Sequence, residues 1–120
     1  ESGHRLIPGS PRSLLFTIQA FIHDAARSPD LSLDDIARSH FISRRKLYDL
    51  FAQINTTPSA YIREERLRLA SRLLHDPALQ MSIGEVALRC GFADVTTFTR
   101  AFRRRFEVTP REWRGANRQG

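Results

Sequence analysis

SIGEVALRCGFADVTTFTRAFRRRFEVTPREW, residues 82–113, carries the clearest structural pattern in the chain. Its apolar residues recur every three or four positions, which is the spacing of a helix with one buried face. Ser82 and Asp94 are residue types that begin helices, and Gly91-Phe92 interrupts the pattern between them. Thr109-Pro110 starts the pattern again, because proline suits the first turn of a helix. The stretch predicts a short helix, a tight turn, a second helix and the beginning of a third.

An earlier part of the chain repeats this pattern, with small offsets at the turns. Residues of like character share a place in the two copies: Ile36-Ala37 and Val86-Ala87, Phe41-Ile42 and Gly91-Phe92, Ser43 and Asp94, Leu47 and Phe98, Phe51 and Phe102, Thr57-Pro58 and Thr109-Pro110, Tyr61 and Trp113. An internal repeat indicates a duplicated supersecondary unit. Each copy fits a helix-turn-helix, whose second helix lies in the major groove of DNA in proteins that bind it. A duplicated helical hairpin that only binds protein is the alternative.

The whole chain is predicted to be all-α, with about seven helices and no segment that alternates like a strand. Residues 1–12 are expected to form a flexible lead-in or linker, and residues 13–117 the folded domain. Within it we expect a first helix-turn-helix at about 32–54, a linker helix at about 58–75 and a second helix-turn-helix at about 82–106. The linker helix would be roughly 27 Å long, near the roughly 34 Å between successive major-groove segments on one DNA face.

Composition favours a polyanionic partner. The 120 residues have a formal net charge of +6, and Lys46 is the only lysine, so arginine supplies most of the positive charge. Arginine presents a planar fork of donors that suits phosphate oxygens and guanine edges. A single cysteine excludes an intramolecular disulfide, and no apolar run has the length of a membrane span, so we expect a cytoplasmic protein.

Catalysis and cofactor binding find no support in the sequence, and we expect no enzyme activity, no cofactor and no metal site. The four histidines are scattered, without the spacing of a zinc site, and there is no glycine-rich phosphate loop. Cys90 beside the second turn is expected to be a small buried packing residue rather than a nucleophile.

The second copy resembles the AraC/XylS type of transcription regulator. The residues that carry the resemblance are Ile83, Val86-Ala87, Gly91-Phe92, Asp94, Phe98, Arg100 to Arg104, Val108-Thr109-Pro110 and Trp113-Arg114, and it extends more loosely from Ser13 to Gly115. The resemblance implies seven helices in two subdomains joined by the long helix. It also implies binding to promoter or operator DNA, with activation or repression of transcription, contact with RNA polymerase, and a separate regulatory domain outside this chain.

Two positions depart from the family's pattern. Glu107 stands where the family usually has a glycine after the sixth helix, and Phe41 replaces a common turn glycine in the first copy. Glutamate in the left-handed backbone of a helix end costs about 1 kcal/mol, so either Glu107 adopts that conformation or the helix ends differently. Asn55, at the equivalent place in the first copy, tolerates it better.

The family's pattern implies which side chains contact DNA. Those expected to contact bases are Arg44, Arg45, Tyr48 and Asp49 in the third helix and Val95, Thr96, Thr99 and Arg100 in the sixth. Arginine pairs with guanine, aspartate accepts from cytosine, and valine or a threonine methyl packs on thymine. Those expected to contact phosphates are Ser43, Arg63, Arg66, Thr97, Arg103, Arg104 and Thr109. Each arginine is alternatively a solvated residue or the partner of a nearby glutamate.

A helical module that contacts the transcription machinery is the second functional hypothesis, and binding to random DNA would separate the two. RNA binding is less favoured, because sequence-specific RNA readers expose stacking aromatics, whereas most aromatics here fall on inward positions. The sequence indicates neither the operator nor the regulated genes.

Overall fold

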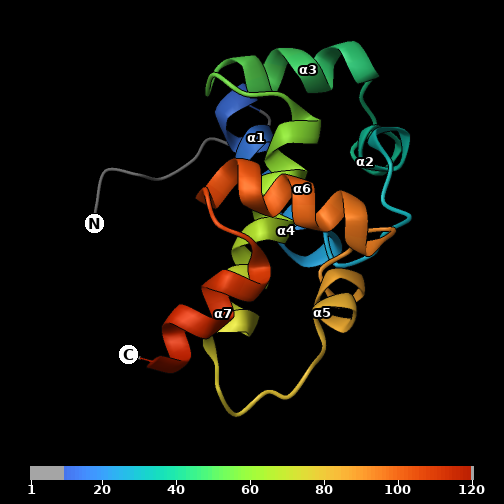
Figure 1. The fold of residues 1–120 in the computed structure, drawn as a ribbon. Coiled ribbons are helices and arrows are strands. Elements are labelled where there is room, and N and C mark those ends of the chain that lie inside the picture. The colour runs from blue at the N-terminus through green and yellow to red at the C-terminus, as the bar shows by residue number, and fades with distance from the viewer. Residues whose placement is uncertain (1–9, 120) are drawn as a thin grey trace. The chain divides into compact units, whose positions relative to one another are not determined.

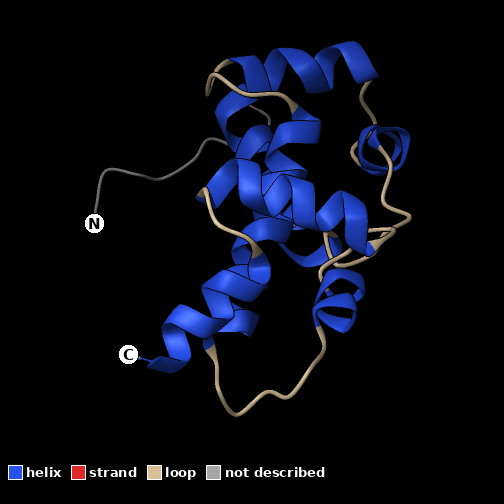
Figure 2. Cartoon of the chain, viewed as in Figure 1, coloured by secondary structure: helices blue, strands red, loops and turns tan. Residues whose placement is uncertain are grey.

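The computed structural model describes residues 10–119, which form seven helices and no strand (Figures 1 and 2). In chain order they are α1 (Pro11–Ala25), α2 (Leu33–Ser39), α3 (Arg44–Ala52), α4 (Pro58–His75), α5 (Ile83–Arg89), α6 (Val95–Phe106) and α7 (Pro110–Gln119). The all-α prediction with about seven helices is confirmed. None of these helices is both long enough and apolar enough to cross a membrane.

Both ends of the predicted domain differ slightly from the structure. Helix α1 begins at Pro11, so the expected lead-in of residues 1–12 includes the first two residues of a helix. A proline is well placed there, since the first turn of a helix needs no partner for its N–H groups. Ser10 precedes this helix, and the other residues of the expected lead-in, 1–9, lie outside the described residues. Helix α7 continues to Gln119, beyond the expected boundary at 117.

The chain divides into two compact units. The first contains residues 1–25 and 31–62, and the second contains residues 26–30 and 63–120. The 18-residue helix α4 therefore begins in the first unit and continues in the second. The short segment after α1, residues 26–30, belongs to the second unit although the helix before it belongs to the first.

The core of the first unit is built where α1 and α2 pack on α3. Its fully buried side chains are aliphatic or aromatic and come from all three helices: Ile18, Ile22, Ile36, Leu47, Leu50 and Phe51. Tyr61 in the first turns of α4 packs against Phe51, with 5.2 Å between ring centroids. Burial of these faces is the main stabilising contribution, at roughly 1.5–3 kcal/mol for each large side chain before the entropic costs of folding.

The core of the second unit repeats this plan. Helices α5 and α7 pack on α6, and α4 covers the same cluster, which includes Leu67, Val86, Phe98 and Phe102. Trp113 in α7 packs edge-on against Phe102 at 5.7 Å, matching the Tyr61 contact with Phe51 in the first unit. The sequence repeat is thus also a repeat of ring contacts.

The two turns have the same hydrogen bonds. The first helix of each helix-turn-helix, α2 or α5, ends in a Schellman motif. In this motif a residue with left-handed backbone is followed by a residue whose N–H donates to a carbonyl oxygen five positions earlier. The equivalent bonds are Phe41 N–H to Arg38 O (3.2 Å) and Gly91 N–H to Leu88 O (3.1 Å), then Ile42 N–H to Ala37 O and Phe92 N–H to Ala87 O (both 3.0 Å).

Three residues that the family's pattern compares with glycine positions have a left-handed backbone. Phe41, Asn55 and Glu107 have φ values of 58°, 59° and 67°. Glu107 therefore ends α6 in the conformation usually given to glycine, and its N–H donates to the Arg103 carbonyl oxygen at 2.7 Å. Of the two alternatives for Glu107, the strained backbone is the one observed.

Candidate nucleic-acid interface

Helix α3 separates its apolar and polar residues onto opposite faces. Leu47, Leu50 and Phe51 are fully buried. The side chains expected to contact bases, Arg44, Arg45, Tyr48 and Asp49, are all exposed, and Tyr48 least so at 39%. Among residues 10–119 Arg45 forms no ion pair, so its guanidinium is available to a ligand.

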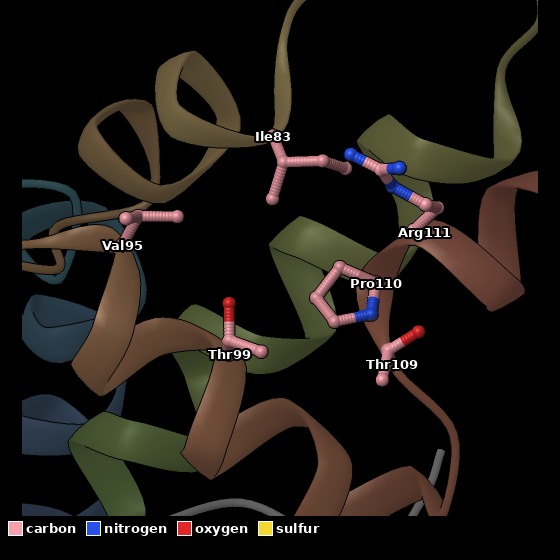
Figure 3. Close-up of a pocket in the computed structure, with 6 residues that line it drawn as sticks. All are labelled: Ile83, Val95, Thr99, Thr109, Pro110 and Arg111. Atoms are coloured by element: carbon pink, nitrogen blue, oxygen red, sulfur yellow. The ribbon is translucent and has the colours of Figure 1, made fainter.

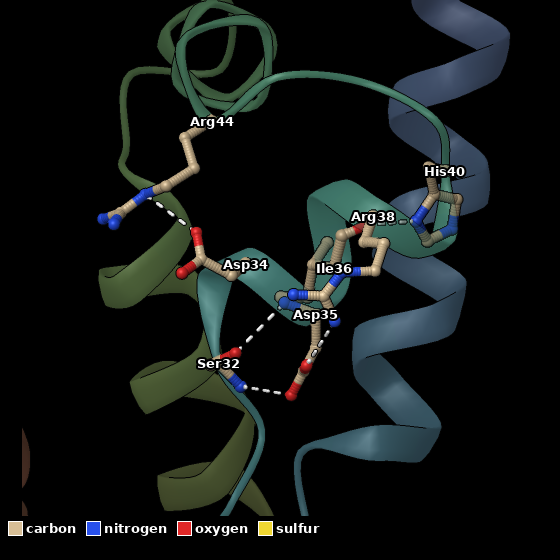
Figure 4. Close-up of polar contacts among 7 residues, drawn as sticks. All are labelled: Ser32, Asp34, Asp35, Ile36, Arg38, His40 and Arg44. Atoms are coloured by element: carbon tan, nitrogen blue, oxygen red, sulfur yellow. Dashed lines mark hydrogen bonds and ion pairs between the residues drawn. The ribbon is translucent and has the colours of Figure 1, made fainter.

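Local hydrogen bonds fix the start of α3 and the helix before it. The Ser43 hydroxyl oxygen accepts from the Lys46 N–H at 3.0 Å, which confirms Ser43 as the cap of α3. Arg44 lies 3.7 Å from Asp34 at the start of α2, and both side chains are more than half exposed (Figure 4). A pair so open to solvent contributes little to stability. Arg44 therefore remains able to turn toward a ligand.

Helix α2 is held by contacts of its own, which Figure 4 also shows. Ser32 and Asp35 form a reciprocal capping box, with bonds of 3.0 and 3.3 Å. At the other end, His40 lies with its Nδ1 2.7 Å from the Ile36 carbonyl oxygen and its ring edge-on to Phe21. These contacts fix the ends of α2 without using any side chain expected to contact bases.

Helix α6 has the same division as α3. Phe98 and Phe102 are fully buried, while Val95, Thr96 and Arg100 are exposed and Thr99 is partly exposed. Val95 is an aliphatic side chain that is 44% exposed at the first position of a helix. Phe98 and Phe102 form the buried face of α6, and Val95 lies outside that face. A thymine methyl is a suitable partner for an exposed valine.

Asp94 caps α6 and holds Thr97. The Thr97 N–H donates to the Asp94 carboxylate at 2.7 Å and the Thr97 hydroxyl donates at 3.2 Å. These bonds, led by the backbone one, keep the pKa of Asp94 below its ordinary value. Thr97 is thereby fixed within the helix start, beside the exposed residues of α6.

The residues expected to contact phosphates fall into two groups. Arg63, Arg103 and Arg104 are exposed, and within the described part of the chain they form no ion pair. Thr109 begins α7 in a capping box with Glu112, and their two bonds measure 2.8 and 3.0 Å. The Thr109 hydroxyl oxygen accepts in that box, so its O–H can still donate to another group.

Arg66 differs from the others, and the structure does not favour the phosphate role expected for it. It is half-buried, and burial lowers the pKa of its guanidinium. Its Nε donates to the Ala26 carbonyl oxygen at 2.8 Å and its Nη2 to the Ser28 carbonyl oxygen at 2.9 Å. The guanidinium thus satisfies two carbonyls of the segment after α1. We leave Arg66 out of the interface.

Arg105 also has an internal partner. Its guanidinium forms a forked pair with Glu64 of α4, with bonds of 2.8 and 3.0 Å, and Glu64 also accepts from Arg68 at 3.1 Å. The hydrogen bond from Arg105 is the main cause that lowers the pKa of Glu64, against the opposing effect of partial burial. The arginine run of α6 is therefore divided, with Arg103 and Arg104 open to solvent and Arg105 engaged.

A pocket of about 390 Å³ lies in the second unit beside the exposed residues of α6 (Figure 3). It is lined by Ile83 at the start of α5, Val95 and Thr99 of α6, and three residues at the start of α7, Thr109, Pro110 and Arg111. Val95, Thr99 and Thr109 are among the residues expected to contact DNA, whereas no role was expected for Arg111. Its place directly after the Thr109-Pro110 helix start is the signal that was available.

Two observations on residues 10–119 concern catalysis and metal binding. Cys90 is fully buried, as expected, and burial raises its thiol pKa to about 11, which keeps it protonated at neutral pH. Among residues 10–119 no cluster of three or more histidine, cysteine, aspartate or glutamate side chains is suited to a metal ion.

A family model described as "Helix-turn-helix domain" matches residues 36–116 of the chain. The chain is 36% identical over 96 residues to the HTH-type transcriptional regulator AlkR of Acinetobacter baylyi, covering 79% of this chain and 30% of that protein. It is 41% identical over 91 residues to the HTH-type transcriptional regulator ArgR of Pseudomonas aeruginosa, covering 75% of this chain and 27% of that one. The chain thus spans about 30% of the length of these relatives.

Solved structures agree with the fold. An AraC-type transcriptional regulator from Chromobacterium violaceum superposes with a TM-score of 0.78 at 36% identity, covering 88% of this chain and 93% of that one. The DNA-binding domain of AdpA, solved in complex with a target DNA, superposes with a TM-score of 0.80 at 26% identity, with the same coverage of both chains. With its duplicated units and this match to the family model, the chain belongs to the AraC/XylS-type family of helix-turn-helix transcriptional regulators.

Proposed function

We propose that this chain binds double-stranded DNA sequence-specifically to regulate transcription, and that α3 and α6 are the helices inserted into the major groove. The observation that carries the proposal is the division of both helices into two faces. Each helix begins at a capping residue, buries one apolar face and exposes a face rich in hydrogen-bonding side chains. A fold neighbour solved on its target DNA supports the same partner.

Within this proposal, bases are read by the exposed residues of the two helices. Arg45 and Arg100 suit guanine, because a guanidinium reaches its O6 and N7 together. Asp49 suits a cytosine amino group, and Val95 suits a thymine methyl. The other readers are Arg44, Tyr48, Thr96 and Thr99. Ser43, Arg63, Thr97, Arg103, Arg104 and Thr109 bind phosphates, which fixes the register of the protein on the duplex.

The two units are proposed to read two blocks of one operator. Helix α4 has 18 residues, or roughly 27 Å, and continues from one unit into the other. A selection of bound sites from random DNA is expected to yield two blocks about one helical turn apart, of order 10 bp. A single short block would contradict reading by both units.

The assignment of readers has its own test. Arg45→Ala and Arg100→Ala are each expected to weaken binding to the selected site by about 1–3 kcal/mol and to relax base preference at one position. Arg38→Ala is the matched control, because Arg38 is an exposed arginine of α2 that pairs with Asp35 of the same helix. Unaltered affinity and base preference in both variants would contradict the assignment of Arg45 and Arg100 as readers.

The dependence of binding on salt separates DNA recognition from the alternative of a protein-interaction module. With about 6 phosphates neutralised, the logarithm of affinity is expected to fall with the logarithm of salt concentration with a slope of roughly −5. A module that binds only protein would show little affinity for random DNA. We further propose RNA polymerase as a second partner, a regulatory domain in a longer protein, and a cytoplasmic location. The greater length of the relatives supports the regulatory domain.

A further inference from the structure

We propose that the pocket between α5, α6 and α7 takes one deoxyribose-phosphate unit of the DNA backbone, with Arg111 holding the phosphate. The inference rests on the proposed function, since it places the duplex against α6. It adds Arg111 and the pocket itself to the phosphate contact that the family's pattern implies at Thr109.

The lining of the pocket suits such a unit. Ile83, Val95 and Pro110 give it apolar walls, and Arg111 adds a cationic head (Figure 3). The Thr99 hydroxyl points into the space that these residues frame. A backbone unit has the matching parts, because the deoxyribose presents carbon-bound hydrogens and the phosphate carries a negative charge with strong acceptor oxygens.

The polar groups of the pocket are available to such a ligand. Arg111 is exposed, and its guanidinium makes no ion pair or hydrogen bond within residues 10–119. The Thr99 hydroxyl likewise has no acceptor in the described part of the chain. Arg66 and Arg105 each bind carbonyl or carboxylate oxygens of the protein itself. Arg111 is thus a free cation at a pocket, with two walls from the helix proposed to read bases.

The place of the pocket favours the DNA backbone over a small molecule. Val95 and Thr99 belong both to the pocket and to the exposed face of α6. When a helix lies in the major groove, which is about 12 Å wide, the phosphates that border the groove lie beside the helix. A cavity next to the reading face is therefore where backbone, rather than base edges, is expected.

The first test compares arginines. Arg111→Ala is expected to weaken binding to the selected operator roughly tenfold. The loss should be equal for operator variants, and the salt slope should become shallower by about 1. Arg111→Lys should recover part of the loss because it keeps the charge. Arg72→Ala is the matched control, since Arg72 is an exposed arginine of α4 outside the pocket. Thermal unfolding checks that each variant is folded.

The second test locates the phosphate. Operator duplexes carrying a single uncharged methylphosphonate linkage, moved one position at a time, are titrated with wild type and Arg111→Ala. Wild type should lose affinity at a linkage beside the second block, and the variant should be insensitive there while staying sensitive elsewhere. If wild type binds the operator but Arg111→Ala behaves like Arg72→Ala, or both proteins give one linkage profile, the pocket assignment is overturned and the proposed function stands. If wild type binds no DNA specifically, both proposals fail.

Discussion

The turns of the two helix-turn-helix units share a left-handed backbone conformation but differ in what surrounds the left-handed residue. Phe41 and Gly91 are both left-handed, with φ of 58° and 98°. The Phe41 side chain is 95% exposed, so nothing opposes its size. A Cβ at Gly91 would overlap the Ala26 carbonyl oxygen and lie 2.7 Å from the Arg66 Nε. The turn itself requires a left-handed residue, whereas the packing of the second turn requires that residue to be glycine.

The second turn is therefore packed against another segment of the chain, whereas the first turn is exposed to solvent. The segment after α1 approaches Gly91, and Arg66 binds two carbonyl oxygens of that segment. A residue with a side chain at position 91 would exclude this approach. The loss of glycine at position 41 is tolerated because that turn has no such neighbour, and the remaining cost is the left-handed backbone of a phenylalanine.

The largest effect is expected from Gly91→Ala. The new methyl group would strain the backbone and displace the Ala26 carbonyl, which we expect to lower the free energy of unfolding by about 3 kcal/mol or more. Urea unfolding measures it. Gly84→Ala is the control, because a Cβ at Gly84 would meet only the Ser82 hydroxyl oxygen at 3.9 Å, and alanine favours the helix. A loss below about 1 kcal/mol at position 91 would show that the second turn is as open as the first.

The next largest effect concerns Arg66, which binds the segment after α1. Arg66→Met keeps the aliphatic stem but leaves two carbonyl oxygens without their donor, so we expect a loss of about 2 kcal/mol in the same assay. Arg63→Met, an exposed change on the same helix, should alter stability by less than about 0.5 kcal/mol. Equal effects at the two positions would mean that Arg66 contributes no more than a surface arginine.

A smaller effect distinguishes the ion pairs of the two units. Glu64 lies 2.8 Å from Arg105 with its side chain 27% exposed, whereas Asp34 lies 3.7 Å from Arg44 and is 60% exposed. Glu64→Gln is expected to lower stability at neutral pH by up to about 1 kcal/mol, and Asp34→Asn by almost nothing. Urea unfolding of the two variants side by side would contradict this contrast if their losses were equal.

The Glu64 effect should depend on pH in a definite direction. The folded-state pKa of Glu64 is below its ordinary value of 4.5, chiefly because of the hydrogen bond from Arg105. Its stabilisation is therefore complete above that ordinary value and is lost as the pH falls through the lower folded-state pKa. The difference between wild type and Glu64→Gln should shrink as unfolding is followed downward from pH 4.5. A difference in the free energy of unfolding that stayed constant with pH would mean that the charge of Glu64 does not stabilise the folded protein.

The smallest effect has the opposite sign. Phe41→Gly removes a left-handed phenylalanine, at a gain of about 1–2 kcal/mol, partly offset by the greater freedom of glycine in the unfolded chain. We expect a net gain of about 0.5–1 kcal/mol in thermal unfolding. Asn55→Gly should gain less, because asparagine tolerates this backbone better. A loss at position 41 would show that the exposed ring makes contacts that stabilise the first unit.

Local patterns in the sequence were sufficient for the helices and their ends. Ser32, Ser43, Ser82 and Asp94 cap helices as expected, because a cap uses only the next three residues. For Glu107 the sequence left open a left-handed backbone or a different helix end, and the left-handed backbone is observed. The exposed faces of α3 and α6 follow from the helical period, so their outward side chains could be predicted from the sequence. Their contacts with DNA stay predictions.

What the sequence determined alone was thus the set of helices, their duplication and the side chains that each helix turns outward, since all of these depend on neighbours a few residues apart. The tertiary structure decided which outward cations are free. Arg66 binds carbonyls 38 and 40 residues away, Arg105 binds Glu64 at a distance of 41 residues, and Arg111 is left unpaired beside a pocket formed by three helices. The helical period cannot distinguish these three arginines, because the partners of Arg66 and Arg105 and the pocket beside Arg111 form only when distant helices pack.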